Sequence, residues 1–188
     1  MGDLLFSAGI SFGRTLVGIA MRPYETYRRI VGRASLWEMV YIAVLLSLYC
    51  VSARIQIVPV VLTYCMTVGI FWWIGRMMGA KGKLQGFMMG WGYTLIPTLV
   101  WFWGTSILYV LVPPPRTTSP QGLLFSVLYL LFSATLLFWK VTLSYLALRF
   151  GLRLDLGKIS VVCAIALPFL MLYSIGMYRL GIFRIPFI

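Results

Sequence analysis

The side chains that could carry acid–base or metal chemistry are few in this sequence. Histidine is absent, the three cysteines form no CxxC pair, and there are four carboxylates: Asp3, Glu25, Glu38 and Asp155. Acid–base catalysis needs a positioned imidazole or carboxylate, and metal-dependent phosphotransfer needs several carboxylate ligands. No HExxH, GxSxG or P-loop motif occurs either. We therefore expect no catalytic residue, no metal and no cofactor, and hence a protein that is not an enzyme.

Lys140 is the basic residue whose position points most directly to function. It lies nine residues before Arg149, so a helix through both would place it about 13 Å below the membrane surface. An ionisable group at such a depth marks a functional site by default. By elimination its acidic partner is Glu38, because the other acids are expected outside the membrane. The alternatives are snorkelling, capping of carbonyls freed by a proline, or contact with a lipid phosphate or a substrate.

The segments that hold these residues are long and apolar. Hydrophobic residues make up 61% of the chain, well above the share in soluble domains. They fall in runs near the ~20 residues that span a bilayer. Five spans are expected, over 36–53, 57–78, 84–112, 121–148 and 159–178, with Pro97 kinking the third. The sequence thus predicts an all-α, polytopic transmembrane bundle (35–180), with an N-terminal arm (1–34) and an interfacial tail (181–188).

The net charge of +12 is distributed around the apolar runs. Basic residues are concentrated in the N-terminal arm, between the second and third spans, and between the fourth and fifth spans. Because cytoplasmic loops carry such an excess, we expect the N-terminus inside the cell and the C-terminus outside. The same distribution argues against a nucleic-acid partner and predicts a multi-pass protein of the cytoplasmic membrane.

The N-terminal arm has the pattern of amphipathic helices that lie on a membrane. Polar and small residues recur in steps of three and four at Ser7, Ser11, Arg14 and Gly18, and Pro23 suits the start of a second short helix. Anionic lipid headgroups are the expected partner of basic side chains on this side, with topology setting alone as an equal alternative. The predicted membrane-surface residues are Arg22, Arg28, Arg29, Arg33, Lys81 and Lys83.

A glycine stripe leads into the third span. Gly82, Gly86 and Gly90 are each four residues apart, so they share one face of a helix. Small residues at this spacing let helix backbones approach closely. The contact is either inside the bundle, or with a partner membrane protein or a second copy of the chain. The predicted helix-packing residues are these three glycines with Gly92, Tyr93 and Pro97.

Three short motifs resemble those of the Yip1-domain family of five-span membrane proteins. Arg22-Pro23-Tyr24, with Ile30 after it, is similar to the arm of bacterial and archaeal members. The Gly-x-Lys-Gly run within 79–89 and Gly92-Tyr93 with Pro97 are similar to the family's third-span region. The resemblance implies an integral membrane scaffold or adaptor of prokaryotic type, without defined chemistry.

Two functions are therefore expected as alternatives. The first is a non-enzymatic scaffold or adaptor of the Yip1 type that acts through helix–helix and lipid contacts, with a membrane-protein partner or as a homo-oligomer. The second is a small transporter or flippase for an anionic lipid or solute, which would use Lys140 inside the membrane.

Overall fold

The computed structural model describes residues 2–33, 36–54, 56–111 and 120–182, and all of its regular elements are helical. They are α1 (Gly2–Met21), α2 (Pro23–Gly32), α3 (Leu36–Ala53), α4 (Ile57–Met77), α5 (Leu84–Gly92), α6 (Leu95–Leu111), α7 (Pro120–Leu146), the π-helical turn η1 (Ala147–Gly151) and α8 (Leu156–Arg179). The predicted all-helical fold is confirmed for this part of the chain. The predicted interfacial tail, 181–188, lies outside it except for 181–182.

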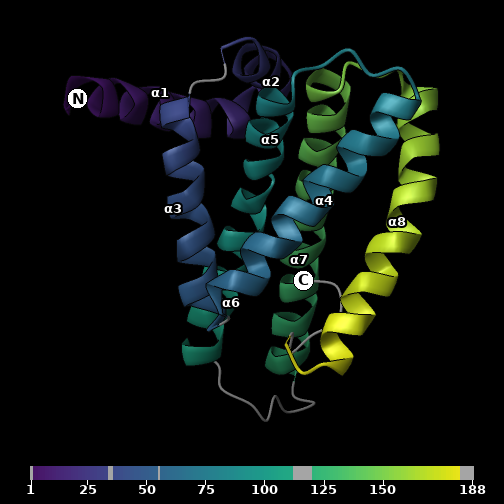
Figure 1. Ribbon diagram of the computed structural model, residues 1–188. Helices are drawn as coiled ribbons and strands as arrows, with labels where there is room; N and C mark the ends of the chain where they lie inside the picture. The colour runs from purple at the N-terminus through teal and green to yellow at the C-terminus, as the bar shows by residue number, and fades with distance from the viewer. Residues whose placement is uncertain (1, 34–35, 55, 112–119, 183–188) are drawn as a thin grey trace.

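Figure 1 shows a helical bundle with a crosswise layer at one end. α3, α5, α7 and α8 run along the bundle, and α4 crosses it obliquely. α1 lies across the upper end, where it contacts α2 and α3, while α2 contacts α5 and η1. We call α1 and α2 together the platform. Both helices predicted for the N-terminal arm are formed, and Pro23 begins the second as expected.

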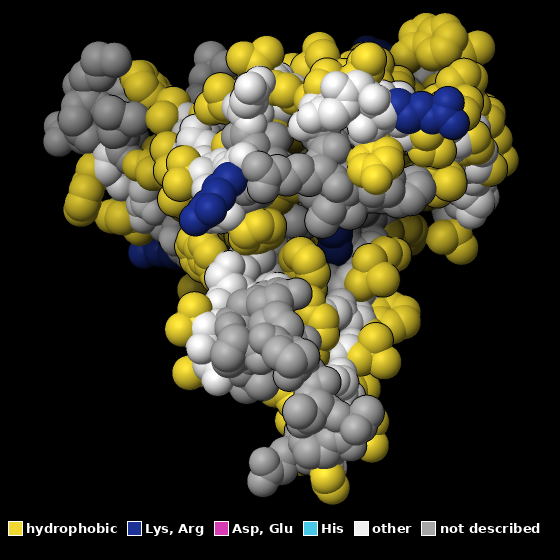
Figure 2. Space-filling model, turned by 90° about the horizontal axis from the view of Figure 1, so that it is seen from below, with side chains coloured by type: hydrophobic (Ala, Val, Ile, Leu, Met, Phe, Trp, Pro, Cys, Tyr) yellow, Lys and Arg dark blue, Asp and Glu magenta, His cyan; other side chains and the backbone are white. Residues whose placement is uncertain are grey.

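Three helices within the described residues are long and apolar enough to cross a bilayer: Ile57–Met77, Gly122–Gly151 and Leu156–Arg179. Large apolar side chains such as Leu131, Phe138 and Leu172 are exposed on them. Seen from below, the side chains coloured by type are mostly hydrophobic, with isolated Lys or Arg among them (Figure 2). Such a surface is typical of helices that face lipid. Five spans, and an N-terminus inside with the C-terminus outside, stay predictions.

The third predicted span is broken rather than kinked. α5 ends at Gly92 and α6 begins at Leu95, so the break comes before Pro97. Pro97 lies in the first turn of α6, where its missing N–H is not needed. Thr94 closes the turn, its Oγ1 donating to the carbonyl oxygen of Trp91 at 2.7 Å. The predicted kink at Pro97 is therefore wrong in position, because a proline in the first turn of a helix does not bend it.

The buried apolar residues of the described chain form three clusters, and one of them lies where α2 meets α5 and η1. Tyr27, Met89, Leu143 and Ala147 are fully buried there in one cluster. Because lipid is as apolar as leucine, close packing rather than exclusion of water must hold these helices together. The π-helical turn η1 extends α7 beyond the predicted end and brings its last residues against the start of α5.

Candidate functional site

The predicted glycine stripe packs inside the chain. A Cβ on Gly82 would lie 1.7 Å from a carbonyl oxygen of η1, and one on Gly86 would lie 3.2 Å from a carbonyl oxygen of α2. Gly90 faces Tyr27, whose Oη donates to the Gly90 carbonyl oxygen at 3.0 Å. Gly86 and Gly90 lie on α5, whereas Gly82 precedes its first residue, so the predicted single helical stripe holds for two of the three glycines. All three allow the α5 segment to pack against α2 and η1, so they do not form an open surface for another chain.

Gly92, Tyr93 and Pro97 lie where the break between α5 and α6 meets α1 and α3. A Cβ on Gly92 would lie 2.6 Å from Cγ2 of Ile42 on α3. The buried Tyr93 ring stacks on Phe12 of α1, with ring centroids 5.8 Å apart. Pro97 is also fully buried. These residues place the platform on the bundle, and none of the three lines either of the two cavities that follow.

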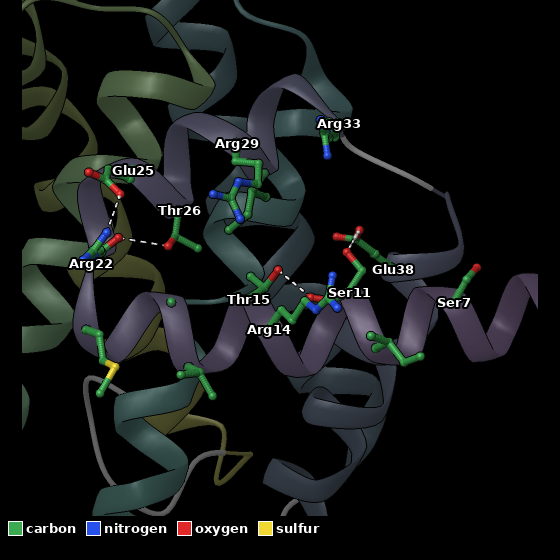
Figure 3. Close-up of a pocket in the computed structure, with 15 residues that line it drawn as sticks. Ser7, Ser11, Arg14, Thr15, Arg22, Glu25, Thr26, Arg29, Arg33 and Glu38 are labelled. Atoms are coloured by element: carbon green, nitrogen blue, oxygen red, sulfur yellow. Dashed lines mark hydrogen bonds and ion pairs between the residues drawn. The ribbon is translucent and has the colours of Figure 1, made fainter.

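A cavity of about 680 Å³ lies between α1, α2 and the first turn of α3 (Figure 3). We call it the arginine cleft, because its lining includes Arg14, Arg22, Arg29 and Arg33. The rest of its polar lining consists of hydroxyls from Ser7, Ser11, Thr15 and Thr26 and carboxyls from Glu25 and Glu38. Four guanidiniums against two ionised carboxylates give the lining a formal charge of +2. This balance favours an anionic occupant.

Some of the charges in the cleft are already matched. Arg22 forms an exposed ion pair with Glu25 at 3.8 Å. Glu38 is buried and accepts a hydrogen bond from Ser11 Oγ at 3.1 Å. Between the side chains that the structure describes, no other basic group lies within 4.0 Å of a carboxylate. The cleft arginines left without an acidic partner are Arg14, Arg29 and Arg33.

The cleft exists because α2 folds back over the polar stripe of α1. The close approach depends on Gly18, where a Cβ would lie 2.5 Å from Oγ1 of Thr26. Thr26 in turn donates to the carbonyl oxygen of Arg22 at 2.9 Å, at the junction of the two helices. Ile19, on another face of α1, is fully buried in the core. The polar stripe predicted from the sequence therefore faces α2 across the cleft.

A further face of α1 is apolar and exposed. Phe6, Val17 and Met21 expose 72%, 60% and 79% of their surface. A helix with polar side chains and Arg14 on one side and large apolar side chains on another is typical of the lipid–water interface. The interfacial position of α1 itself stays a prediction.

Lys140 and Glu38 lie in different cavities. Lys140 lines a second cavity of about 200 Å³ inside the bundle, together with Thr98 and Ser144. Glu38 lines the arginine cleft and is held by Ser11. The expected ion pair between Lys140 and Glu38 is thus not formed. Glu38 instead has a partner on α1, a helix that lies across the end of the bundle, because Ser11 donates a hydrogen bond to it.

The predicted membrane-surface residues divide into two groups. Those that line the cleft are Arg22, Arg29 and Arg33, and those exposed outside it are Arg28, Lys81 and Lys83. Arg14 and Ser11 were not singled out as site residues, although their spacing placed both on the polar stripe. In the described residues no three His, Cys, Asp or Glu side chains gather as a metal site would require.

A family model described as the Yip1 domain matches residues 17–178. This range begins inside α1 and ends one residue before the end of α8, so it includes three of the four cleft arginines, Arg22, Arg29 and Arg33, but not Arg14. Neither the curated proteins nor the solved structures gave a match to the chain.

Proposed function

The chain belongs to the Yip1-domain family, and from this premise we propose that it is an integral membrane scaffold or adaptor without catalytic chemistry. The observation that carries the proposal is the platform, an amphipathic layer fixed across one end of an apolar bundle. A layer of this kind can bind at the membrane surface and present one constant face to a partner.

The platform is attached to the bundle at several points. Tyr27 bonds to the Gly90 carbonyl, and Phe12 of α1 stacks on Tyr41 of α3 with ring centroids 5.0 Å apart. Ile19 and Ile30 add buried apolar contacts. Such attachment supports a fixed surface rather than a loose arm, because each contact restrains a different part of α1 or α2.

Contacts with a partner helix need a surface other than the glycine stripe, which packs internally. In this proposal they fall on the outward faces of the long apolar helices, where Leu131 and Phe138 of α7 and Leu172 of α8 are exposed. Association there would depend on van der Waals packing against another helix in place of lipid.

The test is native mass spectrometry of the full chain purified in mild detergent. We expect it to retain anionic lipid together with a partner chain or a second copy of itself. Phe138→Ser should weaken the chain contact more than Phe6→Ser, which changes a similarly exposed ring on the platform. A monomer that carries neither lipid nor another chain would argue against the scaffold role.

A second candidate function is transport or flipping of an anionic lipid or solute. It is favoured by the cavity around Lys140, which lies beside the broken helix pair α5–α6 and contains the buried hydroxyl of Thr98 without a hydrogen-bond partner. Broken helices beside a polar cavity are a feature of many transporters. Flux into liposomes should fall strongly in Lys140→Met if this function holds, and a flux that is unchanged would remove the reason for it.

A further inference from the structure

We propose that the arginine cleft binds the phosphodiester headgroup of one anionic glycerophospholipid, with the lipid's apolar part along the exposed face of α1. This proposal rests on the membrane role above and names the ligand of its platform. It differs from a general attraction of basic residues to an anionic surface, because it assigns the binding to particular arginines and excludes a neighbouring one.

The first support is the set of unmatched guanidiniums. Arg14, Arg29 and Arg33 come from α1, from α2 and from the residue that ends α2, yet all three line one cavity. Figure 3 shows Arg14 and Arg29 on opposite sides of the space between the two helices. A guanidinium offers paired N–H donors that fit the oxygens of a phosphate. An anion placed here would meet donors from two helices at once.

The second support is the Glu38 carboxylate in the lining of the cleft. Glu38 is buried there beside Ser11, whose hydroxyl donates to it. Because the arginines of the lining outnumber its carboxylates, the site stays positive with Glu38 ionised. The Glu38 carboxylate can also accept hydrogen bonds from O–H groups. The hydroxyls of a glycerol headgroup are such donors. The lining therefore suits a phosphodiester that carries hydroxyls better than a bare phosphate.

The third support separates a lipid from a free phosphate ion. Ile10, Val17 and Met21 line the same cavity and are also exposed on the outside of α1. A phosphate ion gains nothing from apolar side chains, whereas the glycerol and acyl portions of a lipid would cover them. A cavity of about 680 Å³ is also far larger than one phosphate group needs.

The test compares two neighbouring arginines of α2 that differ in one respect. Arg29 lines the cleft and Arg28 does not, although both are exposed. Arg29→Gln and Arg28→Gln therefore remove the same charge from the same helix. Binding of short-chain phosphatidylglycerol to the full chain in neutral detergent is measured by native mass spectrometry. Phosphatidylcholine and inorganic phosphate are titrated separately.

We expect Arg29→Gln to weaken phosphatidylglycerol binding about tenfold or more, the effect of losing one charge-assisted hydrogen bond. Arg28→Gln should stay within about twofold of the unaltered chain, since a screened surface charge contributes little. Val17→Ser should weaken lipid binding as well, because it removes apolar contact. Inorganic phosphate should compete only weakly.

Three results would overturn the proposal. Equal weakening by the two arginine variants would mean diffuse attraction, and no weakening by either would mean that the cleft is not the site. Phosphate that competes as well as the lipid would assign the site to a free anion. If the chain still forms complexes with its partners in any of these cases, the scaffold role survives and only the lipid site fails.

Discussion

The hydrogen bond from Tyr27 to Gly90 is a contact whose removal has a calculable effect. The break after α5 leaves carbonyl oxygens without the usual helical donor. The Thr94 N–H, which would reach Gly90 in a continuous helix, instead donates to Trp91 at 3.0 Å. Tyr27 Oη supplies the missing donor at 3.0 Å from a fully buried ring. The bond thus satisfies a buried acceptor and joins α2 to α5.

Tyr27→Phe removes this donor without opening a cavity. A buried acceptor left without a partner costs about 1–3 kcal/mol. For a chain of this length, each kcal/mol corresponds to about 2–4 °C in Tm. We therefore expect the Tm in detergent to fall by about 2–12 °C. Hydrogen exchange should rise first in α2, because α2 is the element that the bond fixes.

The matched control is Tyr24→Phe on the same helix. The Tyr24 ring is half exposed and contacts Phe150 edge-on at 4.9 Å, an interaction that phenylalanine keeps. Its Tm should change by less than about 1 °C, as for most surface substitutions. If both variants lose the same stability, or if Tyr27→Phe loses none, the capping argument is refuted.

Four further outcomes are expected. Gly82→Ala should abolish the yield of folded protein, because its Cβ would lie 1.7 Å from a carbonyl oxygen, whereas Gly157→Ala, with nothing within 4 Å, should fold normally; similar yields would contradict the packing. Burial, with the nearby Tyr93 phenol adding to it, raises the pKa of Tyr27. The contribution of the neutral phenol to the free energy of unfolding is therefore fully present below about pH 10 and is lost as the pH rises further. Tyr27→Phe should flatten that loss, and parallel pH profiles would disprove it. Lys140→Met and Glu38→Gln should be additive in unfolding free energy within about 0.5 kcal/mol, since they lie in separate cavities; a larger coupling would show that they interact. Reporter fusions should place the two chain ends on opposite sides of the membrane, and the same side for both would rule out five spans.

Helix existence and many helix ends could be predicted from the sequence, because apolar runs end where proline, glycine or charge interrupts them. α3 covers the predicted 36–53, and α2 begins at Pro23 as expected. The break at 93–94 was not predictable in this way. A proline is visible in the sequence, but whether it lies inside a helix or in the first turn of a new one depends on where the preceding helix ends. That end is set by packing against α1 and α3.

The arginine cleft shows the same difference between local and long-range information. The stripe with Ser11, Arg14 and Gly18 was readable from its spacing, since it depends only on helical periodicity. The element that covers this stripe could not be predicted, because α2 returns over the stripe through a turn whose geometry depends on tertiary contacts. The error about Glu38 has the same origin, since a partner chosen by depth in the membrane ignores a helix that lies across the bundle.

The glycine stripe and the cleft are linked through the rotation of α2. Its buried face carries Tyr27, which packs against Gly90 of α5, and Ile30, which lies in the same core cluster as Tyr27. Once that face is fixed, Arg29 lines the cleft and Arg28 does not. Tyr27 and Gly90 do not line the cleft, so they act on it indirectly, by setting which arginines α2 presents. A substitution such as Tyr27→Phe should weaken lipid binding through Arg29 and leave Arg14 in place on α1. The loss should then be smaller than that of Arg29→Gln, because the guanidinium is displaced but still present.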